Sequence, residues 1–312
     1  MTDRLAHAHI AAALLAGLLL HAAAAQTPGR WSNGAPMPSA RTEVAVAEVS
    51  GRIYVVGGYN GERELEIYDP AANSWSRGRG FPHTVHHAAA VGLGGKLYVV
   101  GGYVDGWMPS DAVFAYDPAA DTWTALAPMP TPRGALAAAV HDGRIHAVSG
   151  VAPTRRNTVA HEVYDPVANR WTARADIPTP RDHLALATVV GKLYAVGGRR
   201  NGSYSQNLAV NEAYDPAADR WEARAPMPTA RSGIAAVTVG DHFYVFGGEA
   251  PSGTFAEVES YDPAANTWAA HSPMPTPRHG LGGAAVGGRI HVISGGPRPG
   301  NTSSAANEIF AP

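Results

Sequence analysis

Short runs of alternating apolar and polar residues fill most of the chain, and glycine, proline or asparagine separates them. In one unit, residues 41–49 alternate, residues 52–58 (RIYVVGG) and 65–69 (LEIYD) follow, and a short run surrounds Trp75. Gly51 marks a tight turn, and residues 70–73 (PAAN) form another turn signal. Alternation with period two between turn residues is typical of antiparallel strands. The unit is therefore predicted to contain four antiparallel strands.

This unit repeats along the chain. Tryptophan recurs at positions 31, 75, 123, 171, 221 and 268, so that neighbours are 44 to 50 residues apart. A Tyr-Asp-Pro triplet stands seven residues before each later tryptophan, with its tyrosine at 68, 116, 164, 214 and 261, and a pair of small residues ends every second strand. A period of this length, built from strands and turns, predicts a β-propeller with one blade per repeat.

The two ends of the repeat region predict how the ring closes. The last repeat stops at residues 310–312 (FAP), which match Tyr-Asp-Pro, and it lacks its own fourth strand and tryptophan. Trp31 stands ahead of the first complete repeat with no third strand before it. We therefore expect residues 30–33 to be the fourth strand of the last blade, which leaves no open sheet edge. The propeller domain is predicted to span residues 26–312.

The spacing of these residues resembles the kelch repeat. A Gly-Gly pair such as Gly57-Gly58 is followed about eleven residues later by Tyr68, and Trp75 comes seven residues after that. The resemblance covers the whole predicted domain, six times over. It implies an all-β, six-bladed kelch β-propeller in which the repeated tyrosines and tryptophans fill space between blades. It says little about function, because kelch propellers include adaptors, peptide binders and a few enzymes.

The first 25 residues read as a secretory signal peptide. Arg4 precedes an eleven-residue apolar run at positions 10–20, and three alanines at 23–25 precede Gln26. The run is too short to span a bilayer, which takes about 20 residues. A buried helix packed on the domain is the alternative. We expect a periplasmic or secreted mature protein that begins at Gln26 and has no membrane span.

Composition excludes several classes of function. The chain contains no cysteine, which rules out disulfides, thiolate metal sites, cysteine nucleophiles and a copper oxidase of the kelch type that needs a cysteine-modified tyrosine. A net charge of −2 gives no basic surface for nucleic acid. Histidines 83, 86 and 87 suit transition metals. No matching carboxylate is evident, however, so we predict neither a metal nor a cofactor.

A repeated arginine is the first candidate for ligand binding. The Pro-Met-Pro motif or a variant precedes Arg41, Arg133, Arg181, Arg231 and Arg278. In the second repeat Val85 takes this place. We expect these arginines to converge on the channel mouth, where guanidinium groups suit carboxylates and phosphates. In kelch adaptors that this chain resembles, arginine at the matching position binds acidic peptides. The alternative is a structural role, in which each arginine pairs with a carboxylate such as Glu43, Asp176, Asp182 or Glu249.

Other residues on the same face are the second group of candidates. They are Tyr59, Trp107 and Tyr204 of the variable loops, and His86 and His87, which follow Val85 in an interblade connection. Trp107 is the one tryptophan that falls outside the repeat. An exposed loop tryptophan stacks on sugars or anchors a protein partner, and packing under its own loop is the alternative. Variable loops on a repeated scaffold commonly carry binding sites.

These observations favour an exported binding protein whose loop-rich face takes a protein or acidic peptide, or else a glycan. An enzyme is the alternative, because the chain is similar to periplasmic bacterial kelch epimerases that act on N-acetylneuraminate. In that reading one of the repeated arginines holds the sugar carboxylate. A general acid and base would come from Glu43, Asp182, His183, Glu249 and His279.

Overall fold

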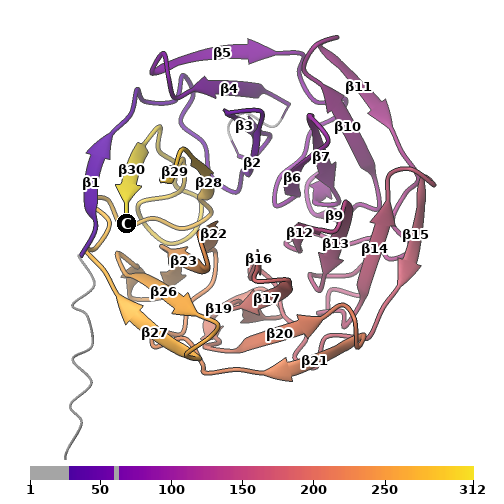
Figure 1. The fold of residues 1–312 in the computed structure, drawn as a ribbon. Helices are drawn as coiled ribbons and strands as arrows, with labels where there is room; N and C mark the ends of the chain where they lie inside the picture. The colour runs from indigo at the N-terminus through magenta and orange to yellow at the C-terminus, as the bar shows by residue number, and fades with distance from the viewer. Residues whose placement is uncertain (1–27, 60–62) are drawn as a thin grey trace, which may run out of the picture.

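The computed structural model describes residues 28–59 and 63–312, which form six four-stranded antiparallel sheets around a central channel (Figure 1). No helix occurs among these residues. The prediction of an all-β propeller with six blades is confirmed. The first three blades are β2 (Ala45–Val49), β3 (Arg52–Val56), β4 (Leu65–Asp69) and β5 (Ser74–Gly78); β6 (Ala89–Leu93), β7 (Lys96–Val100), β10 (Val113–Asp117) and β11 (Thr122–Ala125); and β12 (Ala137–His141), β13 (Arg144–Val148), β14 (His161–Asp165) and β15 (Arg170–Ala173).

The other three blades repeat this order, and the last one recruits a strand from the other end of the chain. They are β16 (Ala185–Val189), β17 (Lys192–Val196), β20 (Asn211–Asp215) and β21 (Arg220–Ala223); β22 (Ala235–Val239), β23 (His242–Phe246), β26 (Val258–Asp262) and β27 (Thr267–Ala270); and β28 (Gly282–Val286), β29 (Arg289–Ile293), β30 (Asn307–Ala311) and β1 (Arg30–Asn33). Strand β1 pairs antiparallel with β30, with Trp31 opposite Phe310. The predicted closure of the last blade by residues 30–33 is confirmed.

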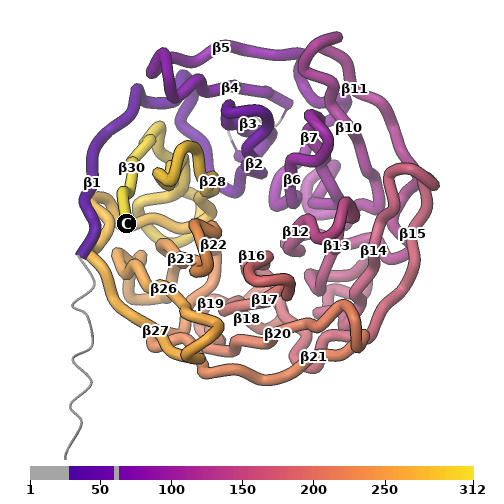
Figure 2. Tube along the Cα trace, in the orientation of Figure 1, coloured from indigo at the N-terminus to yellow at the C-terminus, as the bar shows by residue number. Residues whose placement is uncertain are grey.

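Loops between the second and third strands of three blades carry small hairpins of their own, of which the one in blade four is labelled in Figure 2. They are β8 (Tyr103–Val104) with β9 (Met108–Pro109), β18 (Arg199–Arg200) with β19 (Ser203–Asn207), and β24 (Glu249–Ala250) with β25 (Gly253–Thr254). The turns on the opposite face are short, as expected. Variation between blades is therefore concentrated on one face.

Two strand ends differ from the sequence prediction, and the backbone explains both. The first strand of blade one begins at Ala45 instead of residue 41, because Glu43 has a φ of 57° and turns the chain towards the channel. The second strand ends at Val56 because Gly57 and Gly58 have φ values of 61° and 87°. Such φ values belong to the left-handed region and break a strand.

The apolar core consists of clusters that each join two consecutive blades. One cluster, for example, joins Tyr54 and Val56 of blade one to Leu97 and Val99 of blade two. Each of the six repeated tryptophans donates its indole N–H to a backbone carbonyl in the preceding blade, at 2.8 to 3.0 Å. The interblade role expected for these rings is confirmed. Neighbouring blades are thus joined by apolar packing and by one repeated tryptophan hydrogen bond.

The predicted signal peptide lies outside the described residues, and its removal stays a prediction. Among residues 28–59 and 63–312 there is no apolar helix of the length that a bilayer requires.

Candidate functional site

The five repeated arginines lie inside the blades and not at the channel mouth. Their side chains are completely buried. Each pairs with a glutamate on the third strand of its own blade at 2.6 to 3.0 Å and also donates to a carbonyl of the second strand. The pairs are Arg41–Glu66, Arg133–Glu162, Arg181–Glu212, Arg231–Glu259 and Arg278–Glu308. The expected convergence on the channel is not seen. The structure favours the structural alternative for these arginines, but the carboxylates suggested from the sequence, Glu43, Asp176, Asp182 and Glu249, are not their partners.

The second blade shows that each pair behaves as a unit. Val85 stands at the arginine position of this blade, and Phe114 stands at the glutamate position. Phe81 lies against Phe114 with ring centroids 5.2 Å apart, and all three residues belong to one apolar cluster. The sequence held this signal, since glutamate stands two residues before Tyr-Asp-Pro in the blades that have the arginine, and phenylalanine where valine replaces it.

Peptide groups from the six interblade connections close a ring at the channel mouth. The ring residues, two positions after the repeated arginine, have φ values between 52° and 67°. The N–H of each donates to the carbonyl oxygen of its counterpart in the preceding blade at 2.7 to 3.0 Å. The ring residues are Glu43, His87, Ala135, His183, Gly233 and Gly280. These N–H and carbonyl groups of the mouth are therefore hydrogen-bonded to one another, and side chains supply any chemistry there.

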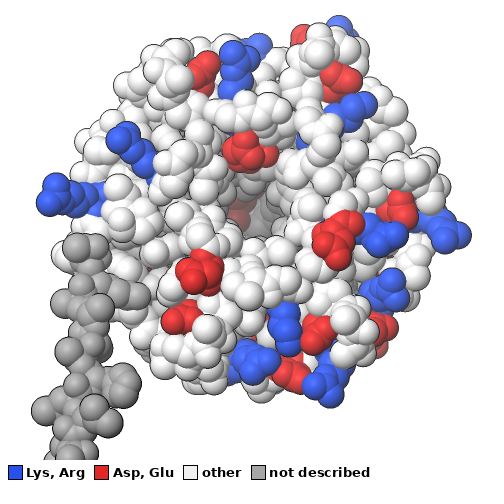
Figure 3. Space-filling view, in the orientation of Figure 1, with Lys and Arg blue, Asp and Glu red and all other residues white. Residues whose placement is uncertain are grey.

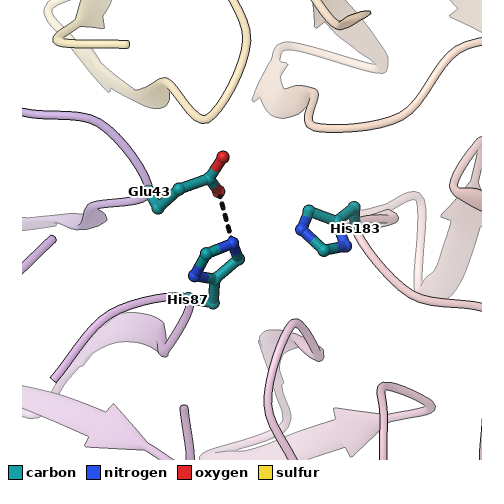
Figure 4. A group of neighbouring side chains, drawn as sticks. All are labelled: Glu43, His87 and His183. Atoms are coloured by element: carbon teal, nitrogen blue, oxygen red, sulfur yellow. Dashed lines mark ion pairs between the residues drawn. The ribbon is translucent and has the colours of Figure 1, made fainter. Parts of the chain in front are cut away.

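Three of the ring side chains are functional groups, and they point towards one another from three different blades (Figure 4). Glu43 Oε2 lies 3.2 Å from His87 Nε2. One potential ligand atom from each of Glu43, His87 and His183 lies within 4.8 Å of the other two. Beneath them, the first strands line the channel mostly with small and branched side chains. The triad thus lies at the entrance of a channel lined mostly by small and branched side chains.

A second layer of buried polar side chains surrounds the triad. Asp182 Oδ1 accepts from His183 Nδ1 at 2.6 Å, and Arg199 Nε lies 3.3 Å from the same oxygen. Arg199 also donates to Glu249 Oε1 at 2.6 Å and to His183 Nε2 at 2.8 Å. His279 Nδ1 lies 3.3 Å from Glu43 Oε1 and 3.6 Å from Glu249 Oε2. Together with the triad, the network joins five blades across the channel mouth.

Burial and neighbouring charge shift the pKa values in this network. Burial by itself raises the pKa of Glu43, but His87 and His279 outweigh it and hold that pKa well below its usual value. Burial lowers the pKa of His87 well below that of free histidine, and Arg199 adds to the effect. For His279, burial also lowers the pKa, but Glu43 and its neighbours outweigh burial and raise it. The carboxylate of Glu43 is therefore ionised at neutral pH, whereas burial opposes protonation of His87.

Aromatic side chains from the loops cover one side of the network. The Tyr59 ring lies 4.7 Å from His86, and the Trp107 ring lies 5.0 Å from His86 and 5.2 Å from His87, measured between centroids. Trp107 is 62% exposed, which argues against packing under its own loop. Tyr204 lies under the Arg199 guanidinium, with 5.7 Å from Cζ to the ring centroid. The structure thus brings Tyr59, His86, His87 and Trp107 into one neighbourhood, whereas Tyr204 contacts Arg199.

A cavity of about 730 Å³ opens beside these aromatics, between the loops of blades two, three and four. Trp107 and Met108, both more than half exposed, form one wall, and Arg155 and Arg199 are on another. A second cavity of about 460 Å³ shares Asn201 with the first and is lined by Arg156 and Arg200. On the face drawn in Figure 3, positive and negative side chains are interspersed around the central hollow.

Sequence reasoning missed the loop arginines. Arg199 and Glu249 each follow the Gly-Gly pair of their repeat, at the position of Tyr59 and Tyr103 in the first two blades. These positions form isolated bridges with the residue after the repeated arginine, for example Asp182 with Arg199. Glu249 was already a candidate, and aligning the repeats at this position would have identified Arg199 as a neighbour of the mouth as well. His83 belongs elsewhere, since its ring packs on Phe81 at 4.8 Å.

Comparisons with known proteins agree with this architecture. The solved structure titled "Structure of YjhT" is similar with a TM-score of 0.76 and 15% sequence identity, over 87% of this chain and 95% of that one, which shows a shared fold alone. No curated protein matches the sequence. The family described as the KLHDC2/KLHL20/DRC7 Kelch-repeats domain matches residues 24–198 and 154–311, together nearly the whole propeller. This chain therefore belongs to that Kelch-repeat family.

Proposed function

We propose that the protein is a binding protein that takes an acidic segment of a partner protein in the two adjoining loop-face cavities. The observation that carries this proposal is the pairing of an exposed apolar wall with unpaired positive charge. Trp107 and Met108 offer apolar surface, while Arg155, Arg156 and Arg200 are exposed on the loops beside them. Within the described part of the chain, none of these three arginines forms an ion pair with a carboxylate.

The chemistry of the two walls defines the ligand. An aromatic ring and a methionine take an apolar side chain, and aromatic residues are the usual anchors of protein interfaces. Guanidinium groups bind carboxylates in a bidentate way. A peptide with an apolar residue next to two or three acidic residues therefore fits best. Kelch propellers commonly bind proteins, which is consistent with such a ligand.

The test is a fluorescence-polarisation titration with a set of acidic peptides and their Glu→Gln, Asp→Asn counterparts. We expect binding of acidic peptides that weakens with salt, because exposed charges are screened. Trp107→Ala and the triple variant Arg155→Glu, Arg156→Glu, Arg200→Glu should each reduce affinity by about tenfold or more. Arg52→Glu, on the face of short turns, is the matched control. Equal affinity in the triple variant and the control would contradict the proposal.

A sugar-acid mutarotase is the second candidate, and one contact favours it. His183, oriented by Asp182, lines the same cavity as Arg199. A histidine backed by a carboxylate can act as general acid and base, and an arginine can hold a sugar carboxylate. The experiment is anomer exchange of N-acetylneuraminate followed by NMR. Acceleration that disappears in His183→Asn would replace the peptide proposal, whereas exchange at the uncatalysed rate supports it.

We also propose that the chain is exported to the periplasm or beyond. The apolar run at residues 10–20 and the alanines before Gln26 support this. Expression in a bacterial host followed by fractionation and mass measurement tests it. A mature mass that begins at Gln26 in the periplasmic fraction is the expected result. A full-length protein in the cytoplasm would contradict it.

A further inference from the structure

We propose that Glu43, His87 and His183 form a binding site for one first-row divalent transition-metal ion at the channel mouth. The three side chains come from blades one, two and four and point towards a common centre (Figure 4). Their ligand atoms lie within 4.8 Å of one another. The proposal does not depend on the peptide ligand, because Glu43 and His87 lie in the ring and only His183 also lines a loop-face cavity.

The hydrogen bonds of His86 fix the orientation of the His87 lone pair. His86 Nε2 lies 2.6 Å from the carbonyl oxygen of Gly106, which can only accept, so Nε2 carries the hydrogen. With both rings uncharged, His86 Nδ1 accepts from His87 Nδ1, 2.6 Å away. The lone pair on His87 Nε2 then faces Glu43 Oε2 at 3.2 Å. A proton or a metal ion between the two atoms removes the repulsion of their lone pairs, and a metal ion that binds here displaces the proton.

The second imidazole is oriented in the same way. His183 Nδ1 donates to Asp182 Oδ1 at 2.6 Å, which leaves the lone pair on Nε2. A carboxylate behind a histidine ligand is the usual outer-shell arrangement at metal sites, because it fixes the tautomer. Arg199 Nη2 now donates to this nitrogen at 2.8 Å, and a metal would take its place. Arg199 keeps its bonds to Glu249 and Asp182 after that exchange.

Space and charge both suit an ion. A cavity of about 90 Å³ lies within the ring, bordered by the triad and by Ala135, Gly233 and Gly280. This volume holds an ion and water ligands, since a water needs only about 10–15 Å³ of such space. The carboxylates of Glu43, Asp182 and Glu249 face one guanidinium, that of Arg199, and one imidazole, that of His279. Three carboxylates outnumber these two groups, which favours a cation.

The donor set indicates the class of metal. Two imidazole nitrogens and one carboxylate oxygen suit zinc, iron, cobalt, nickel or copper, whereas calcium and magnesium prefer oxygen ligands alone. Three protein ligands leave positions for water or for a small ligand. The sequence predicted no metal because the three ligands are 44 and 96 residues apart along the chain, and only the ring brings them together.

The experiment is a titration of the EDTA-dialysed mature protein at pH 8 with Zn²⁺, Co²⁺ and, as the hard-ion control, Mg²⁺. We expect one Zn²⁺ per chain by calorimetry, a higher melting temperature with Zn²⁺ through linkage, and visible Co²⁺ absorption typical of imidazole ligation. Mg²⁺ should bind at least about a hundredfold more weakly. Absence of stoichiometric Zn²⁺ binding would overturn the proposal.

Three substitutions locate the ion. His87→Asn and His183→Asn keep the backbone, because asparagine tolerates the φ values of 53° and 52° at these positions, and Glu43→Gln keeps the shape of the third ligand. Each should weaken Zn²⁺ binding by about tenfold or more. His242→Asn is the matched control, since His242 contacts Asp241 and Asp262 on the surface.

Unchanged binding in the triad variants, or an equal loss in His242→Asn, would place the ion elsewhere and overturn the site. Melting curves recorded in EDTA establish that each variant folds. If a histidine variant does not fold, Glu43→Gln decides the result on its own. Peptide titrations in EDTA keep this test independent of the proposed peptide binding.

Discussion

Two sets of arginines in this propeller have opposite environments. The five that repeat, such as Arg231, are completely buried and bound to a glutamate within their own blade. The loop arginines Arg155, Arg156 and Arg200 occur once each, are exposed, and stand beside an exposed tryptophan. The arginines that repeat therefore stabilise the blades, whereas these three, which do not repeat, lie on a surface that is free to bind a ligand.

The comparison teaches why residue type alone misled the sequence prediction. A guanidinium suits a ligand carboxylate and a buried glutamate equally well. Burial and partner decide between these roles, and both depend on the strand opposite. The second blade shows that the pair can be replaced. Val85 and Phe114 stand in place of its two members, and the blade keeps the same four-stranded sheet.

The largest expected effect comes from breaking one repeated pair. Arg231→Leu leaves Glu259 buried without its partner, and removal of one member of a buried ion pair costs about 3–5 kcal/mol. We expect the free energy of unfolding in urea to fall by that amount. A loss below about 1 kcal/mol would show that the scaffold role assigned to these arginines is wrong.

A double substitution that copies the second blade sharpens the same comparison. Arg231→Val with Glu259→Phe replaces the pair by apolar residues, which is often neutral for stability. We expect the double variant to recover about 2 kcal/mol relative to Arg231→Leu, measured in the same urea experiment. The single variant Glu259→Phe is the control. A double variant no more stable than either single one would contradict the idea of an exchangeable unit.

Blade three contains a buried histidine pair at core positions that depart from the repeat. This pair makes the stability of the fold depend on pH. His146 Nδ1 lies 2.9 Å from His161 Nε2. Burial lowers the pKa of His146 to about 3 and that of His161 to about 4. The unfolded chain therefore binds more protons below about pH 6.5, and stability falls as the pH decreases from there towards 4.

The matching variant is His161→Asn, because asparagine occupies this position in blades four and six as Asn211 and Asn307. Between pH 7 and pH 5, we expect the free energy of unfolding of this variant to fall by about 1–2 kcal/mol less than that of the parent. Urea midpoints at the two pH values measure the difference. An identical loss in the variant and the parent would exclude this pair as a source of acid sensitivity.

The smallest effect on stability is expected for the loop arginines. Arg155→Ala and Arg200→Ala should each change the free energy of unfolding by less than about 0.5 kcal/mol, since exposed side chains contribute little. The same variants should weaken acidic-peptide binding. A large loss of stability in either variant would place these residues in the scaffold and remove the contrast between the two sets.

The fold was predictable because the repeat spacing and the turn residues are local signals. Residues 30–33 were correctly assigned to the last blade, since Trp31 had no third strand before it. The neighbourhood of Tyr59, His86, His87 and Trp107 was also predictable from their place on one face. Arg155 and Arg199 were not, because their positions depend on loop conformations, and the triad was not, because its members meet only across the channel.

At the channel mouth, backbone hydrogen bonds determine the conformation, and side chains determine the functional groups. The hydrogen bonds of the ring use backbone atoms alone, so a change of side chain need not disturb them. Ala135 carries a minimal side chain, and a Cβ at Gly233 would meet its nearest neighbours at 3.4 Å, which is ordinary contact. With φ values of 52° and 67°, both positions accept asparagine or aspartate. Polar side chains can thus be introduced at positions 135 and 233 of the mouth without a change in the backbone of the propeller.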